Sequence, residues 1–128
     1  MNKILSFVMV GSNDFKKSSI FYDSIFVHLK IKKVVTTERY IGYAHLNEPN
    51  EVRFYITKPH NEKPATIGNG TMIAFLAETK EAVNKFHSTA LENGAVDEGS
   101  PGIREDGNYY AYIRDLDGNK ITTKCISN

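Results

Sequence analysis

The chain has 128 residues, of which 41% are hydrophobic and 24% are charged, and its 16 Lys and Arg against 15 Asp and Glu leave a net charge of +1. These totals are typical of one globular domain, residues 1–128, that can bury a core without disulfides, and they give no support to nucleic-acid or membrane binding. Cys125 is the only cysteine and cannot form an intrachain disulfide, so we expect a cytoplasmic protein.

The first half of the chain predicts a strand, a helix and three more strands. The apolar segment Ser6–Val10 is typical of a buried strand. Asp14 is a good N-cap for a helix over Phe15–His28, where Phe21 and Ile25 lie on one apolar stripe. Three short alternating segments then predict strands at Lys30–Thr37, Arg39–Leu46 and Val52–Thr57.

The segment 58–69 contains Pro59, Pro64 and Gly68, which favours a linker. It divides the chain into two modules, about 1–57 and 70–128. The two modules have the same predicted order of elements, as the second half shows.

The second half predicts a strand, a helix and three strands again. Thr79 is a good N-cap for a helix over Lys80–Asn93, which is expected to stop at Gly94. The segment Gly99–Asn108 is rich in glycine and charge and predicts a loop. The strands are expected at Thr71–Phe75, Ala95–Glu98, Tyr109–Arg114 and Lys120–Ile126.

The two halves align at an offset of 65 residues, which pairs Phe21 with Phe86 and Asp14 with Thr79. The chain is therefore predicted to be α+β, with two βαβββ modules. A single βαββ unit would also suggest a ferredoxin-like or RNA-binding sheet. That alternative lacks the aromatic and basic strand face that RNA stacking needs, and it does not explain the second copy.

The stretch Asp115–Asn119, DLDGN, could be a calcium loop or a hairpin turn. An EF-hand loop starting at Asp115 needs glycine at its sixth position and glutamate at its twelfth, where this chain has Lys120 and Ile126. Gly118 and Asn119 tolerate positive φ, and a strand follows at once, which favours the hairpin.

Several motifs of the second half resemble the glyoxalase/bleomycin-resistance/extradiol-dioxygenase superfamily, whose fold is called the vicinal oxygen chelate fold. They are GT-x-x-AF from Gly70, FH at Phe86, EG-x-PG-x-R from Glu98 and YIRD-x-DGN-x-I from Tyr112. VGSNDFKKSSIFYD from Val10 agrees more loosely. The resemblance covers nearly the whole chain and implies an open, curled cup of mixed β-sheet with the helices outside.

The resemblance also implies four positions for His and Glu ligands of a divalent metal inside the cup. They fall on Phe7, Tyr55, Met72 and Thr122. None of these side chains is a usual ligand of iron, manganese, zinc or nickel in such sites. The sequence therefore predicts that the metal is absent, and no other cofactor is expected.

Strand alternation predicts which side chains line the cup. Ile121, Ala111 and Phe54 suit the helix side, so their neighbours should face the other way. The predicted ligand-binding residues are Phe7, Tyr43, Arg53, Tyr55, Met72, Arg104, Tyr110, Tyr112, Arg114 and Thr122, with Met9 beside them. This lining suits a small organic ligand with a planar body and an anionic or carbonyl group. The alternative that Phe7, Met9 and Met72 fill the cup as core stays open.

Three functions fit the sequence. The first is a metal-free protein that binds a small organic molecule, as in the bleomycin-resistance branch, for which the resemblance implies a homodimer. The second is an unconventional metal-dependent glyoxalase or dioxygenase. The third is a metal-independent lyase or isomerase that uses Tyr or Arg groups. No catalytic residue can be assigned from the sequence, so whether the protein is an enzyme stays open.

Overall fold

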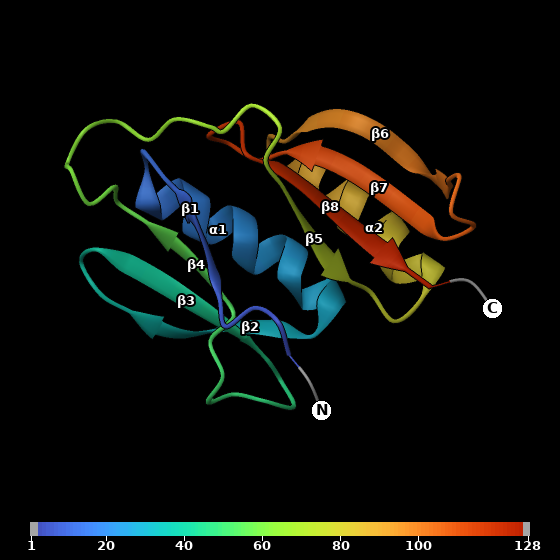
Figure 1. Ribbon diagram of the computed structural model, residues 1–128, viewed down its shortest axis with the longest axis horizontal. Coiled ribbons are helices and arrows are strands. Elements are labelled where there is room, and N and C mark those ends of the chain that lie inside the picture. The colour runs from blue at the N-terminus through green and yellow to red at the C-terminus, as the bar shows by residue number, and fades with distance from the viewer. Residues whose placement is uncertain (1–2, 127–128) are drawn as a thin grey trace.

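The computed structural model describes residues 3–126, which form two modules of one helix and four strands each (Figure 1). The first module contains β1 (Val8–Gly11), α1 (Phe15–Phe26), a 3₁₀ turn (Val27–Leu29), β2 (Ile31–Thr36), β3 (Tyr40–His45) and β4 (Phe54–Thr57). The second contains β5 (Met72–Leu76), α2 (Lys80–Glu92), β6 (Val96–Ile103), β7 (Tyr109–Arg114) and β8 (Lys120–Cys125). No helix among these residues is long and apolar enough to cross a membrane.

Each module forms one four-stranded mixed sheet. The strand order is β1-β4-β3-β2 in the first and β5-β8-β7-β6 in the second. In both sheets the first strand of the module pairs in parallel with the last, and the other pairs are antiparallel. The prediction of an α+β fold with two βαβββ modules is therefore confirmed.

Both helices begin where the sequence predicts. The Asp14 carboxylate accepts a hydrogen bond from Lys17 N at 3.1 Å, and the Thr79 hydroxyl accepts one from Ala82 N at 3.0 Å. These side chains satisfy backbone N–H groups that have no partner within the helix. The first helix ends earlier than predicted, because a 3₁₀ turn follows it and Lys30 adopts a left-handed conformation with φ of 60°.

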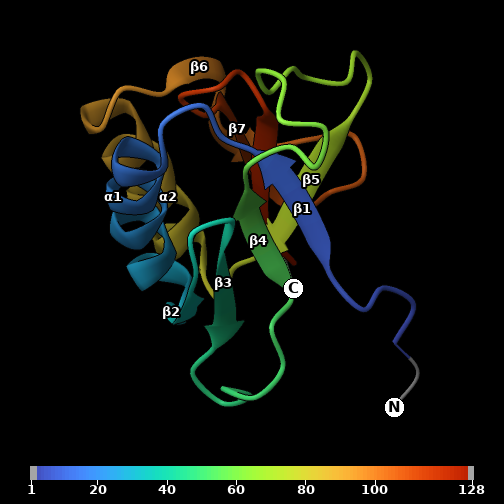
Figure 2. The same ribbon diagram turned by 90° about the vertical axis from the view of Figure 1, so that its left-hand side faces the viewer.

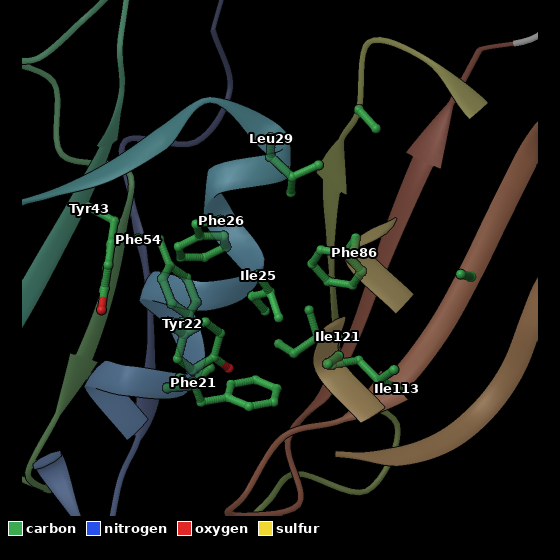
Figure 3. Close-up of a cluster of buried hydrophobic side chains, with 14 of the residues drawn as sticks. Phe21, Tyr22, Ile25, Phe26, Leu29, Tyr43, Phe54, Phe86, Ile113 and Ile121 are labelled. Atoms are coloured by element: carbon green, nitrogen blue, oxygen red, sulfur yellow. The ribbon is translucent and has the colours of Figure 1, made fainter. Parts of the chain in front are cut away.

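The two helices lie together on one side of the sheets and share one core with them (Figures 1 and 2). Phe26 of α1 lies at its centre: its ring is 5.4 Å from that of Phe54 on β4 and 5.0 Å from that of Phe75 on β5. Figure 3 shows the α1 side chains of this core between the two sheets: Phe21, Tyr22, Ile25 and Phe26. Phe86, Ile113 and Ile121 of the second module pack beside them. Each sheet thus has one face on the helices. We call the opposite face its free face.

Strand β6 is longer than predicted, so the expectation of a loop over Gly99–Asn108 is wrong for its first half. Residues up to Ile103 stay paired with β7, although the register shifts between Asp97 and Gly99 and again between Gly99 and Gly102. Such bulges let an edge strand accommodate glycine and proline while its pairing continues.

The DLDGN segment forms the hairpin turn that the sequence favours. Gly118 N donates to Asp115 O at 3.0 Å, and Gly118 has φ of 90°. The turn also contacts the start of α1 in the other module. Asp117 accepts hydrogen bonds from Asn13 N at 2.9 Å and from the Ser18 hydroxyl at 3.2 Å.

Candidate functional site

The free face of each sheet carries side chains that alternate with the buried ones, as predicted. In β4, Phe54 and Ile56 are buried against the helices, while Tyr55 lies on the free face beside Met9 of β1. Several large apolar side chains of the free faces are exposed: Phe7 at 49%, Met9 at 45%, Met72 at 45% and Leu76 at 70%. Exposed apolar groups gathered on one side of a protein make that side a candidate binding surface.

A cavity of about 430 Å³ lies between β1, with the segment before it, and β5, at the boundary of the two sheets. Both Phe7 and Met72 contribute to its wall, so the cavity joins the two free faces. Its lining is predominantly apolar: Leu5, Ser6, Phe7, Val8, Arg53, Met72, Ile73, Ala74 and Phe75. A volume of this size accommodates a small organic molecule.

An aromatic cluster continues from this cavity along the free face of the first sheet. The Tyr55 ring makes edge contacts with Phe7, at 5.2 Å between centroids, and with Tyr40, at 5.4 Å. Tyr55 lies opposite Gly42 of β3. A Cβ atom at Gly42 would lie 2.9 Å from Cε1 of Tyr55 and 2.6 Å from Cγ1 of Val35, so only glycine leaves room for this packing.

The free face of the second sheet carries two stacked tyrosines. The rings of Tyr110 and Tyr112 are 5.8 Å apart and inclined by 4°. The Tyr110 hydroxyl donates to Asp106 at 2.5 Å, which raises the pKa of Tyr110 and lowers that of Asp106. Tyr112 lies opposite Gly99 of β6, in the same relation that Tyr55 has to Gly42.

The three predicted guanidinium groups differ in what they contact. Arg53 donates to Ser6 O at 2.9 Å and pairs with Glu51. Arg114 pairs with Glu98 at 2.9 Å and donates to Gly118 O at 3.1 Å. Arg104 donates to Ser100 O at 2.6 Å and lies over the Tyr112 ring.

Arg53 and Arg114 therefore have carboxylate partners, whereas Arg104 has none among residues 3–126. This difference in pairing makes Arg104 the most available guanidinium of the three for an anionic ligand.

Three of the four positions that the resemblance assigns to metal ligands carry side chains that do not suit a metal. Phe7 is a phenyl ring and Met72 a thioether, both on the cavity wall. Thr122 is fully buried, and its hydroxyl donates to Ala111 O at 2.6 Å. In the described part of the chain, no three His, Cys, Asp or Glu side chains are placed to hold a metal ion together.

Tyr43 does not face the cup, so that expectation is wrong. It is 1% exposed, packs against Tyr22, Phe26 and Phe54, and its hydroxyl donates to Asp23 at 3.0 Å. Eight of the ten predicted residues lie at the free faces with partly or fully exposed side chains: Phe7, Arg53, Tyr55, Met72, Arg104, Tyr110, Tyr112 and Arg114. Thr122 belongs to the same face but is buried.

Sequence reasoning did not select Lys120 and Lys124, although alternation places them on the free face. Lys120 Nζ is 5.6 Å from the Tyr112 ring centroid, and Lys124 Nζ is 5.5 Å from that of Tyr110. The available signal was their position two residues on either side of Thr122.

Comparisons with known proteins agree with this architecture. The sequence profile of the Glyoxalase/Bleomycin resistance protein/Dioxygenase superfamily matches residues 4–123. Among curated proteins, none matches the chain. A glyoxalase/bleomycin resistance protein from Albidiferax ferrireducens has a similar crystal structure: TM-score 0.87, 39% identity, with 96% of this chain and 98% of that one covered.

More distant structures share the fold. The lactoylglutathione lyase of Agrobacterium tumefaciens has a TM-score of 0.69 at 16% identity, covering 98% of this chain and 95% of that one. The fosfomycin resistance protein FosX of Listeria monocytogenes has a TM-score of 0.69 at 16% identity, covering 99% and 96%. The profile match over most of the chain and the 39% identical structure show that this chain belongs to the glyoxalase/bleomycin resistance protein/dioxygenase superfamily.

Proposed function

We propose that this protein binds a small organic molecule on the free faces of its sheets and that its family metal site is degenerate. One observation carries the proposal: Phe7 and Met72, at two positions where the family resemblance implies metal ligands, form the wall of an apolar cavity of about 430 Å³. A phenyl ring and a thioether favour contact with an apolar or planar organic group over coordination of a hard cation.

The residues proposed to contact the ligand are exposed or partly exposed side chains. They lie around this cavity, in the aromatic cluster at Tyr55, and at the stacked pair Tyr110 and Tyr112. Phe7, Tyr55 and Met72 supply apolar contact near β1 and β5. Tyr110 and Tyr112 offer a stacked pair on the second sheet. Arg53, Arg104 and Arg114 lie beside them. Thr122 is left out of the proposal because it is buried.

We also propose that two copies associate through the free faces. Met9, Met72 and Leu76 expose apolar groups there that a second copy would cover. Light scattering at micromolar concentration is expected to give the mass of a dimer. Leu76→Glu, which puts a charge on the most exposed of the three, is expected to give a monomer. A monomeric mass for the wild type would contradict this part of the proposal.

A titration with the neutral fluorescent dye N-phenyl-1-naphthylamine tests the binding site. Saturable binding is expected, and Phe7→Ser or Met72→Ser should each weaken it roughly tenfold, because a buried apolar contact of this size is worth about 1.5–3 kcal/mol. The matched control is Ile20→Ser, since Ile20 is 54% exposed and lies on the helix side. Binding that does not saturate, or that Ile20→Ser weakens equally, would contradict the proposed site.

A further inference from the structure

Two cations lie over the same aromatic ring on the free face of the second sheet. The Cζ atom of Arg104 is 5.4 Å from the centroid of the Tyr112 ring, and Nζ of Lys120 is 5.6 Å from it. Tyr112 is itself stacked on Tyr110. The three residues come from three neighbouring strands or their ends, since Arg104 follows β6, Tyr112 belongs to β7 and Lys120 begins β8.

These two cations differ in their ion pairing from the other cations of the same face. The same face has two other cations with acidic partners: Arg114 is 2.9 Å from Glu98, and Lys124 is 3.9 Å from Asp106. Neither Arg104 nor Lys120 has an ion pair within the described residues. On this face the cations without an ion pair are therefore the two at Tyr112, where an anion can be bound by charge-assisted hydrogen bonds.

The backbone of β6 leaves space for the Arg104 guanidinium. A Cβ atom at Gly102 would lie 2.9 Å from Nη1 of Arg104, and one at Gly99 would lie 3.3 Å from Nη2. Nη2 also donates to Ser100 O at 2.6 Å. Two glycines and one carbonyl thus hold the guanidinium against β6 and over Tyr112. Gly99 and Gly102 are positioning residues for Arg104.

We propose that Arg104 and Lys120 bind the oxyanion group of a planar organic anion whose ring system lies beside Tyr112. This inference rests on the proposed function, and it adds the charge of the ligand and the residues that recognise it. Arg104 uses one N–H group on Ser100 O, and a guanidinium has five such donors, so donors remain for a carboxylate or sulfonate.

The test compares two dyes with the same anilinonaphthalene body. The first, 8-anilinonaphthalene-1-sulfonate, carries a sulfonate; the second, N-phenyl-1-naphthylamine, is neutral. Wild-type protein is expected to bind the sulfonate about tenfold more tightly at fixed ionic strength. Arg104→Met and Lys120→Met should each reduce the preference for the sulfonate over the neutral dye about tenfold, because each removes a charge that only the sulfonate can pair with. Arg39→Met and Lys32→Met remove the same charges elsewhere, and both should leave the two affinities unchanged.

Gly102→Ala separates the position of the guanidinium from its charge. Gly102 does not have a positive φ, and the added Cβ meets only the end of the Arg104 side chain. The variant should fold, keep every charge and still lose sulfonate affinity as Arg104→Met does. An unchanged affinity in Gly102→Ala would show that the guanidinium acts only through its charge and would overturn its proposed positioning.

The outcomes separate this inference from the proposed function. Equal affinity of the wild type for the two dyes would overturn the proposal that the ligand is an anion, and would leave the proposed apolar site standing. Failure of the neutral dye to bind at all would count against the apolar site itself. Sodium sulfate is compared with sodium chloride at the same ionic strength. If only the sulfate displaces the sulfonate dye, Arg104 and Lys120 bind inorganic oxyanions, which would overturn the proposal of an organic anion.

Discussion

The Tyr22 hydroxyl donates a hydrogen bond of 2.6 Å to the Asp115 carboxylate, from a helix of the first module to the hairpin turn of the second. The two residues are 93 positions apart, and both are buried. Asp115 also accepts bonds from the backbone N–H groups of Asp117 and Asn119, at 3.0 and 2.8 Å. The DLDGN turn therefore connects the modules as well as reversing the chain.

Tyr22→Phe removes this hydrogen bond and leaves a buried carboxylate with one donor fewer. We expect the free energy of unfolding to fall by about 1–3 kcal/mol, as measured by denaturant titration. Tyr43→Phe is the matched control, because Tyr43 is also buried but donates to Asp23, which is half exposed. Its loss should be smaller, about 0.5–1 kcal/mol. Equal losses in the free energy of unfolding would show that the Tyr22 hydrogen bond stabilises the protein no more than that of Tyr43.

The pKa of Asp115 should depend on Tyr22. Burial raises the pKa of the Asp115 carboxyl above 3.8, while the hydrogen bond from Tyr22 lowers it. Tyr22→Phe is therefore expected to raise that pKa further, which carbon NMR of the Asp115 carboxyl measures directly. A lower pKa in the variant would contradict this account of the contact.

The same shift predicts how stability depends on pH. Because the pKa in the folded state lies above the value in the unfolded state, the folded protein binds more protons in the interval between them. The contribution of Asp115 to the free energy of unfolding should therefore fall as pH rises through that interval, and stay constant above it. It is measured as the difference between the wild type and Asp115→Asn from about pH 3 to about pH 7. A contribution that grows with pH would contradict this sign.

Gly42 is predicted to be essential to the arrangement of Tyr55. Its Cβ would meet Val35, Val52 and Tyr55 at 2.6, 2.8 and 2.9 Å, so Gly42→Ala forces the ring away from Phe7. We expect a loss of about 1–3 kcal/mol in the free energy of unfolding, together with weaker binding of the neutral dye. Stability within about 0.5 kcal/mol of the wild type would show that the sheet absorbs the methyl group without moving Tyr55.

Restoring ligand residues tests the assignment of the degenerate metal site. Phe7→His, Met72→His and Thr122→Glu together are expected to create affinity for zinc, measured by calorimetry on the folded variant. Because Thr122 is fully buried, the double variant without Thr122→Glu is the control for a loss of folding. A folded triple variant that binds no more zinc than the parent would show that these positions do not converge.

The sequence predicted the fold well because each module repeats the same local signals. Both N-caps, both apolar helix stripes and the alternation around Tyr55 agree with the structure. The prediction for Tyr43 was wrong because its strand has a tyrosine on each face, Tyr40 and Tyr43. Ile41 lies two residues before Tyr43, so both side chains lie on the same face, and the apolar Ile41 was the signal for the buried helix side.

The sequence predicted Arg104 as a ligand-binding residue, but its position over Tyr112 depends on tertiary pairing. Glycine and proline in β6 indicate a loop when read locally, and only pairing with β7 keeps them in an edge strand with two bulges. Arg104 directly follows this strand and lies over Tyr112. No local pattern encodes that contact.

Native mass spectrometry of gently purified, untagged protein tests the central claim most directly, because it reports subunit count, bound metal and bound organic molecule in one spectrum. We predict a dimer without a transition metal that carries an extra organic mass. A transition metal bound in stoichiometric amount would contradict the degenerate site and would favour a metal-dependent enzyme.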